Sequence, residues 1–173
     1  CAQHALFLAE ALQPILLRVH APDRRQHQLH LAVVEAALPF DLDELAGIEL
    51  RRRNVAISTY VAQRLPTLMV DPILIEQVVL NLLKNAAEAI DSAQLPGVRR
   101  HIELRVVPRH TPDEGGVIEF SVTDSGPGLK DEVIGRLYEA FFSTKAEGLG
   151  IGLSLCRSII ESHRGRMRAQ NLY

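Results

Sequence analysis

One stretch near the middle of the chain, from Asp71 to Ile90, constrains the possible folds more than any other. Asp71 is a favourable N-cap residue, and Pro72 suits the first position of a helix. No glycine and no further proline interrupts the sequence before Pro96. The stretch therefore predicts one long helix that ends near Pro96-Gly97.

Two asparagines, Asn81 and Asn85, distinguish this helix from an ordinary amphipathic one. A spacing of four puts both amides on one face. The apolar residues recur with helical spacing and supply a face that would pack on a sheet, namely Leu74, Val78, Leu82 and Ala89. Amides beside a buried face need hydrogen-bond partners. Those partners are either nearby backbone groups or a ligand, and the helix alone leaves both interpretations open.

The composition is typical of one domain with an aliphatic core. The 173 residues are 47% apolar and only 5% aromatic, with no tryptophan, as in α/β or α+β proteins. A net charge of −2 points to neither nucleic acid nor an anionic membrane, and the arginines at 51–53 and 99–100 are interpreted as solvated faces. No apolar run approaches the length of a membrane span, so the chain is expected to be soluble. Cys156 lies in an apolar helical pattern, which argues against disulfides and favours a reducing, cytoplasmic compartment.

The N-terminal part predicts a separate helical unit. Apolar residues at helical spacing over 2–19 indicate a helix, which Pro14 would kink. Residues 21–28 are polar and punctuated by proline, so they read as a linker, and a second apolar-periodic stretch runs from Leu29 to about Leu50. We therefore expect one unit over 1–28 and a main domain over 29–173. A chain that begins at Cys1 has the look of a fragment.

Four segments have strand character. Residues 55–61 are rich in β-branched and aromatic residues, and 67–70 is a shorter candidate. Residues 101–107 and 117–123 alternate and are joined by a Gly-rich loop, which predicts a hairpin. Ile118, Phe120 and Val122 would share its buried face.

The hairpin's second strand runs directly into Asp124-Ser125-Gly126-Pro127-Gly128. Glycines let a backbone turn tightly and approach a flat ligand, while a carboxylate at the strand end can accept from an exocyclic amine. A plain turn explains this motif equally well.

A second glycine-rich segment follows a short predicted helix over 131–140. Phe141-Phe142-Ser143-Thr144-Lys145 leads into Gly148-Leu149-Gly150-Ile151-Gly152, where another helical pattern opens. Backbone amides, a helix N-terminus and a lysine together suit phosphate. The signal alone is weak, because it is neither the dinucleotide fingerprint nor the GxxxxGK[ST] loop.

Taken in order, the Asn-x-x-x-Asn helix, DSGPG, FFSTK and GLGIGL form a specific set. The chain from about residue 30 resembles the ATP-binding catalytic domain of sensor histidine kinases, in the GHKL superfamily. Details such as Asp71-Pro72 resemble the nitrogen-regulation type, which has a short ATP lid. The resemblance implies a two-layer α/β (α+β) sandwich of the Bergerat type, with a mixed, mostly antiparallel sheet and helices on one face, preceded here by the helix over 2–19.

The resemblance also implies roles for individual residues. Asn85 would bind Mg²⁺ with Asn81 beside it, Asp124 would accept the adenine amine, and Lys145 would neutralise phosphate charge. Asn81 and Lys145 would act in catalysis, and Phe141 and Phe142 would anchor the lid by packing. The full set of ATP-binding residues implied is Asn81, Asn85, Asp124, Gly126, Gly128, Thr144, Lys145, Gly148, Leu149, Gly150, Gly152 and Leu153.

Asn81 also bears on the reaction. Related ATPases such as DNA gyrase carry a water-activating glutamate at this point, and an amide cannot act as that base. The resemblance therefore implies transfer of the γ-phosphoryl group to a histidine. Neither His4 nor His20 has the family's acceptor context, so the acceptor is expected on a helical hairpin upstream of this chain.

The implied partners are ATP with Mg²⁺, that hairpin, a response regulator and, in the full-length protein, a second copy that completes a homodimer. The resemblance also allows a membrane anchor elsewhere in the full-length protein. Two alternatives stay open: a nucleotide-binding signalling module without transfer, and a serine kinase of the anti-sigma type. The resemblance implies that residues 1–28 are the C-terminal part of the dimerisation hairpin with a linker. The helix predicted over 2–19 therefore counts against the serine kinase, because that type lacks a helical hairpin.

Two departures from the family pattern stand near the C-terminus. Arg164 occupies a position that is usually glycine, and a left-handed conformation there would cost roughly 1 kcal/mol. The family also continues into a final strand beyond the equivalent of Tyr173, so the domain is expected to lack that strand.

Overall fold

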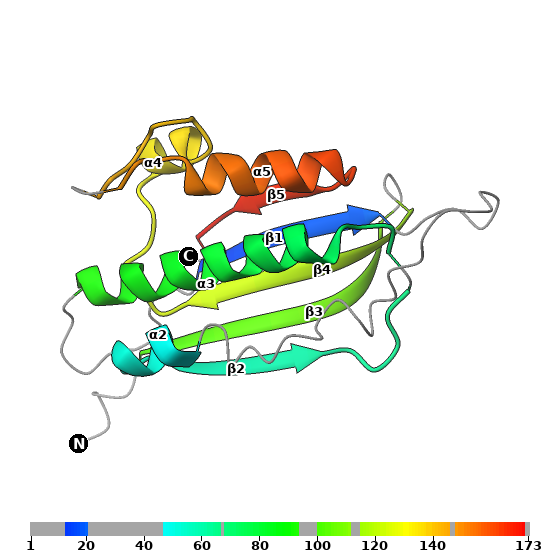
Figure 1. The fold of residues 1–173 in the computed structure, drawn as a ribbon, viewed down its shortest axis with the longest axis horizontal. Coiled ribbons are helices and arrows are strands. Elements are labelled where there is room, and N and C mark those ends of the chain that lie inside the picture. Colours follow the sequence, from blue (N-terminus) through cyan, green and yellow to red (C-terminus); the bar gives the residue numbers. More distant parts are fainter. Residues whose placement is uncertain are drawn as a thin grey trace, which may run out of the picture.

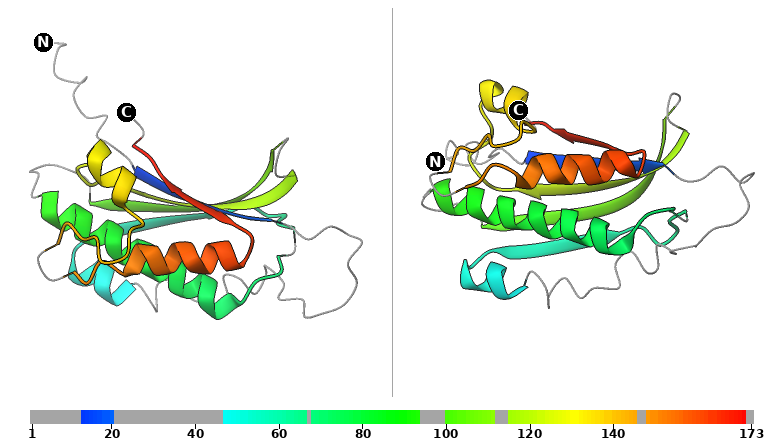
Figure 2. Two further views of the ribbon diagram at one scale, coloured as in Figure 1. Left: turned by 90° about the horizontal axis from the view of Figure 1, so that it is seen from above. Right: turned by 45° about the horizontal axis from the view of Figure 1, so that its top comes forward.

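A computed structural model describes residues 13–20, 47–66, 68–93, 100–111, 115–145 and 148–171. A five-stranded sheet in the order β2-β3-β4-β1-β5 carries the helices on one face, as Figures 1 and 2 show. The elements are β1 (Gln13–His20), α2 (Gly47–Arg52), β2 (Ala56–Val61), α3 (Pro72–Ala93), β3 (His101–Thr111), β4 (Gly115–Asp124), α4 (Asp131–Arg136), α5 (Gly152–Ser162) and β5 (Arg166–Ala169). The predicted two-layer sandwich is confirmed.

Helix α3 forms where its capping residues predict. The Asp71 Oδ1 accepts hydrogen bonds from the backbone N–H groups of Ile73 at 2.9 Å and Leu74 at 3.2 Å. Its buried side chains pack on the sheet: Ile75, Val78, Val79, Leu82, Leu83, Ala86, Ala87 and Ile90. Of the predicted packing set, Val78 and Leu82 are buried, whereas Leu74 is 38% exposed and Ala89 is half-buried.

The predicted hairpin is confirmed by the antiparallel pairing of β3 with β4. Ile118, Phe120 and Val122 are all buried, as their alternation predicted. Strand β2 covers the segment expected at 55–61 and pairs in parallel with β3, so the sheet is mixed but mostly antiparallel. The strand expected at 67–70 is wrong, because Leu68 forms only an isolated bridge and Thr67 lies outside the described residues.

The helix predicted over 2–19 is wrong for Gln13 onward, because Gln13–His20 is strand β1 between β4 and β5. Residues 2–12 lie outside the described part. Apolar residues over a short run fit a strand as well as a helix, and Pro14 disfavours a helix interior. The proposed division between residues 28 and 29 falls in undescribed sequence, but β1 itself belongs to the sheet that the main domain forms.

A buried carboxylate ties β1 to the hairpin on the sheet's other face. Glu119 of β4 is 6% exposed, and it accepts hydrogen bonds from Arg18 Nε at 3.0 Å and Arg109 Nε at 3.2 Å. Arg18 lies directly opposite Glu119 in the register of β1 with β4. Since a buried carboxylate needs a partner, this pairing supports β1 in the strand position.

The remaining helices match their predictions apart from their lengths. Helix α4 stops at Arg136 rather than near Ala140, and α5 begins at Gly152 within the glycine-rich segment. Helix α2 is the only described part of the periodic stretch expected over 29–50, and its Leu50 is buried. Among the described residues, no helix is long and apolar enough to cross a membrane.

The C-terminus of α5 is joined to the N-terminus of α3 through His163. The backbone N–H of Asp71 donates to His163 Nε2 at 3.0 Å, and His163 Nδ1 lies 2.8 Å from the carbonyl oxygen of Ile159. Because Nε2 accepts, Nδ1 is the nitrogen that carries the proton. This histidine is the C-cap residue of α5 and links it to the start of α3.

The left-handed conformation expected at Arg164 is confirmed by a φ of 57°. We predict that Arg164→Gly raises the free energy of unfolding by about 1 kcal/mol, because glycine adopts this conformation without a Cβ clash. Urea denaturation measures the change. Arg164→Ala is the matched control, since it removes the side chain but keeps the Cβ; a gain of the same size in that variant would contradict the backbone explanation.

Candidate functional site

Asn81 is held by the first turn of α5. Its Nδ2 donates to the carbonyl oxygen of Gly152 at 3.0 Å and to Cys156 Sγ at 3.2 Å. Both amide protons are thus used, and within the described part of the chain no hydrogen bond reaches Asn81 Oδ1. The Asn81 amide thus fits both interpretations given above, because its nitrogen donates to protein groups while its oxygen can still accept from or bind a ligand.

Asn85 lies one turn further along α3 and meets the loop after α4. Its Oδ1 accepts a hydrogen bond from Lys145 Nζ at 2.9 Å, and the same ammonium forms an ion pair with Glu88. The structure therefore brings Asn85 and Lys145 together. Glu88 was not predicted, although its position three residues after Asn85 on one helix face could have indicated it.

Asp124 ends β4 and is 7% exposed. Its Oδ1 accepts from the backbone N–H of Gly126 at 2.7 Å, and the other carboxylate oxygen has no partner among the described residues. Burial raises the pKa of Asp124 to about 6, against the weaker opposing effect of the Gly126 hydrogen bond. A half-satisfied buried carboxylate suits a ligand that donates a hydrogen bond.

Gly126 lets the turn after β4 lie close to α3. A Cβ built on Gly126 would lie 2.6 Å from Asp124 Oδ1 and 3.2 Å from the Cβ of Ala89 in α3. Any side chain here would push the loop away from the helix, so the close approach requires glycine. The turn after β4 and the asparagine helix consequently border one site.

Phe141 and Gly150 approach each other closely. The backbone N–H of Phe141 donates to the carbonyl oxygen of Gly150 at 2.9 Å. Gly150 has a φ of 66°, and a Cβ there would lie 2.5 Å from the Phe141 carbonyl carbon. Phe142 packs under Arg136 with 4.4 Å from the guanidinium to the ring centroid, as expected of an anchor. Phe141 is 81% exposed, so the expectation that its ring packs is wrong.

The other predicted residues differ in their exposure. Thr144, Gly148 and Leu149 are exposed, and among the described residues no hydrogen bond or ion pair joins them to Asn81, Asn85 or Asp124. Leu153 is partly buried and packs against the hydrophobic core. Gly128 follows Asp124 with a φ of 87°, and Gly152 lies against Asn81. The structure thus brings together Asn81, Asn85, Lys145 and Gly152, with Asp124 and Gly126 against the same helix.

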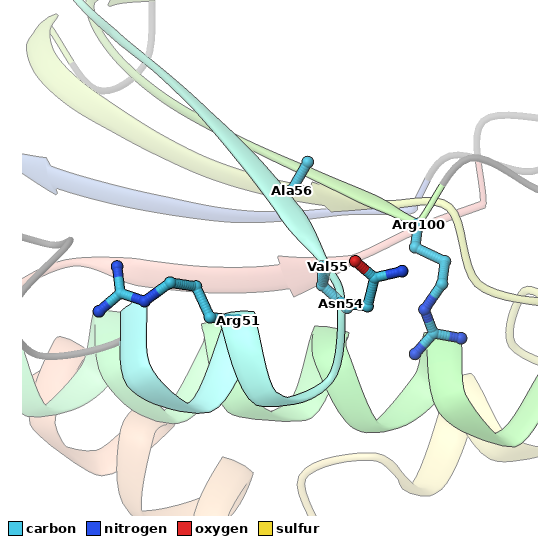
Figure 3. A pocket seen from close by; sticks show the side chains of 5 residues that line it. All are labelled: Arg51, Asn54, Val55, Ala56 and Arg100. Carbon is cyan, nitrogen blue, oxygen red and sulfur yellow. The ribbon is translucent and has the colours of Figure 1, made fainter.

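A separate pocket lies at the junction of α2, β2 and the residue before β3, and Figure 3 shows its lining. It contains none of the predicted site residues: its lining is Arg51, Asn54, Val55, Ala56 and Arg100. Arg100 and Arg53 both form ion pairs with Asp91. The expectation that the two arginine clusters are only solvated faces is therefore wrong for these two residues. The pocket is therefore a junction between elements rather than part of the site.

A comparison with known families assigns the chain. The pattern of the family described as "Histidine kinase-, DNA gyrase B-, and HSP90-like ATPase" matches residues 70–172. The chain belongs to this ATPase family. The match includes every residue named above in the site, so the resemblance to a histidine kinase ATP-binding catalytic domain is confirmed.

Several similar proteins are named as sensor proteins or sensor histidine kinases. Identity is 40% over 127 residues to the sensor protein FixL of Bradyrhizobium diazoefficiens, covering 73% of this chain and 23% of FixL. It is 38% over 117 residues to the C4-dicarboxylate transport sensor protein DctS of Rhodobacter capsulatus, covering 68% of this chain and 17% of DctS. The chain thus spans about a fifth of the length of these relatives.

Solved structures agree on the ATPase fold. The full-length ShkA structure in complex with AMPPNP has a TM-score of 0.57 at 27% identity, covering 79% of this chain and 27% of ShkA. The mycobacterial sensor histidine kinase MprB has a TM-score of 0.57 at 24% identity, covering 78% of this chain and 80% of that chain. The predicted histidine kinase catalytic fold is therefore confirmed.

We predict that the stability of this domain depends on pH through Asp124. Its pKa rises from 3.8 to about 6 on folding, so the native state binds the proton more tightly and loses stability as the pH rises through this range. Asp124→Asn should remove this loss. The variant's advantage in free energy of unfolding should grow by up to about 3 kcal/mol between pH 4 and 6 and then level off.

Urea denaturation of both proteins over a pH series measures this difference. Asp131→Asn, at the exposed start of α4, is the matched control and should show no such growth. A difference between the parent and Asp124→Asn that stays constant with pH would contradict the raised pKa.

Proposed function

We propose that this domain binds Mg-ATP and donates the γ-phosphoryl group to a histidine on a helical hairpin. The observation that supports this proposal best is the convergence of Asp124, Asn81, Asn85 and Lys145 on one side of α3. A buried acceptor stands at one end of this row, and amide oxygens with an ammonium stand along it. Such a row suits a nucleotide, with its purine base at one end and its charged phosphate chain along the rest.

Asp124 would recognise adenine. Its unpartnered oxygen can accept a hydrogen bond from the exocyclic amine, while Gly126 keeps the backbone close to the flat ring. A purine with a carbonyl oxygen in place of the amine would set two hydrogen-bond acceptors against each other, with no proton between them. The site should therefore discriminate between an amine and a carbonyl on the purine.

The phosphates and the metal would lie along α3. Lys145 supplies a positive charge, and the amide oxygens of Asn81 and Asn85 are neutral ligands of the kind that Mg²⁺ accepts. Among the described residues no group of three or more His, Cys, Asp or Glu side chains could hold a metal by itself. The donor set therefore fits an ion that completes its shell with phosphate and water. Bound Mg²⁺ would neutralise charge on the transferring phosphoryl group.

Asn81 supports transfer over hydrolysis. Its nitrogen is fixed by Gly152 and Cys156, and an amide cannot take a proton from water. Nothing in this position would activate a water molecule, so the γ-phosphoryl group would persist until an acceptor is held in line with it. We further propose a homodimeric full-length protein and a response regulator as the later acceptor of the phosphoryl group.

The serine kinase alternative stays distinct from this proposal. The helix that counted against it is wrong for residues 13–19, so that argument no longer applies. Two relatives named as sensor histidine kinases, TmoS at 35% identity and ZraS at 30%, favour histidine as the acceptor. The silent-module alternative would bind ATP equally well, and only a transfer assay separates it from the kinase.

We predict that Asp124→Ala abolishes measurable ATP binding in calorimetry, because the adenine amine loses its acceptor. For the parent, inosine triphosphate, which has a carbonyl in place of the amine, should bind about 10- to 100-fold more weakly than ATP. Asp131→Ala is the control for removal of a nearby exposed carboxylate. If the folded Asp124→Ala variant binds ATP as the parent does, the adenine assignment is wrong.

We predict only trace release of free phosphate from ATP by the unmodified chain, because general-base assistance, worth roughly 10²- to 10⁴-fold, is missing at Asn81. A coupled phosphate assay measures this. Adding the acceptor hairpin of a related sensor kinase should give an acid-labile phosphohistidine on the hairpin. Steady hydrolysis would instead indicate that the domain is an ATPase. Labelling of a serine on a protein substrate would support the serine kinase.

A further inference from the structure

We propose that Glu88 is a second cation-binding residue of this site, beside Asn85, and that the Lys145 ammonium occupies their common position until Mg²⁺ displaces it. This inference rests on the proposed function, because it concerns the metal that accompanies ATP. It assigns a role to a residue outside the predicted set. It also gives Lys145 two successive partners, first the helix and then the phosphates.

The geometry that supports this inference lies on one face of α3. Asn85 and Glu88 are three residues apart, so their side chains project from neighbouring positions on the helix. Lys145 Nζ contacts Asn85 Oδ1 at 2.9 Å and also contacts Glu88 Oε2. One amide oxygen and one carboxylate oxygen thus converge on a single positive charge.

The chemistry of the two ligands matches a hard cation. Mg²⁺ binds oxygen ligands and typically takes one or two carboxylates together with phosphate and water. The pair carries one negative charge in total, which a monovalent ammonium neutralises and a divalent ion exceeds. The excess positive charge would be matched by the phosphates of ATP, so the exchange is favourable only when the nucleotide is present.

An ordinary surface ion pair is the alternative explanation for the contact. The Lys145 side chain is 45% exposed, and exposed ion pairs contribute little to stability. The Glu88 side chain is only 22% exposed, and its partner shares the amide oxygen that the metal is proposed to use. A structural ion pair would affect melting temperature alone, whereas a cation position would alter how nucleotide affinity depends on Mg²⁺.

The Lys145 ammonium can change partners while the backbone of Lys145 stays in place. The backbone N–H of Lys145 donates to Ser143 Oγ at 3.0 Å, and the Ser143 hydroxyl donates to the carbonyl oxygen of Lys145 at 3.3 Å. Neither hydrogen bond involves the Lys145 side chain. Moved from Glu88 to a phosphate oxygen, the ammonium would keep a negative partner throughout the exchange.

The test measures binding rather than turnover. Calorimetry gives the Kd of a non-hydrolysable ATP analogue in EDTA and at a series of MgCl2 concentrations for the parent, Glu88→Gln and Lys145→Met. Glu88→Gln should reduce the enhancement of affinity by Mg²⁺ on the order of 10-fold, as losing a supporting ligand does. Its Kd in EDTA should not weaken, because the change removes a negative charge near the phosphates.

Lys145→Met should have the opposite pattern. Its Kd in EDTA should weaken, because a phosphate partner is lost. Half of the magnesium effect should be reached at a lower MgCl2 concentration, because no ammonium competes for Asn85. Glu76→Gln and Lys84→Met are matched controls on the same helix, and both should behave like the parent.

The outcomes separate the inference about Glu88 and Lys145 from the proposed function. If the analogue binds Glu88→Gln with an unchanged magnesium enhancement, the inference about Glu88 is wrong and the proposed function stands. An unchanged magnesium midpoint in Lys145→Met would show that the ammonium does not compete for the position. Failure of the parent to bind the analogue at any MgCl2 concentration would instead overturn the proposed function itself.

Discussion

The packing of α3 on the sheet is the interaction on which the site depends. Eight side chains of this helix are buried, and each large one contributes about 1.5–3 kcal/mol on leaving water. This packing fixes the rotation of the helix, and with it the half-buried row of Asn81, Asn85 and Glu88 at the edge of the apolar face. A rotation that moved this row would also expose Val78 or Leu82.

Segments far apart in the sequence meet at that row. Helix α5 brings Gly152 and Cys156 to Asn81, the loop after α4 brings Lys145 to Asn85, and Gly126 fits against Ala89. In Figure 1 α3 lies across the sheet with α5 beside it and α4 near the start of α5. The glycines permit these approaches, while the side chains that reach the row supply the chemistry.

The sequence predicted those features whose signals are local. The cap at Asp71, the β3 to β4 hairpin and the left-handed Arg164 depend on residues a few positions apart. Strand β1 was mistaken for a helix because its short apolar run fits both periods, and its partner Glu119 is 101 residues from Arg18. Glu88 lies outside the predicted set because its contact with Lys145 spans 57 residues, and only its position three residues after Asn85 is a local signal.

The domain has a feature that costs stability and that a ligand would relieve. Burial raises the pKa of Asp124 to about 6, so the carboxylate is charged at neutral pH and its burial then costs stability. Only one of its two oxygens has a partner among the described residues. The adenine amine would supply the missing partner. Because a ligand that binds only the native state stabilises it, ATP should raise the melting temperature most at a pH above the Asp124 pKa, where the carboxylate is charged and the unliganded domain is at its weakest.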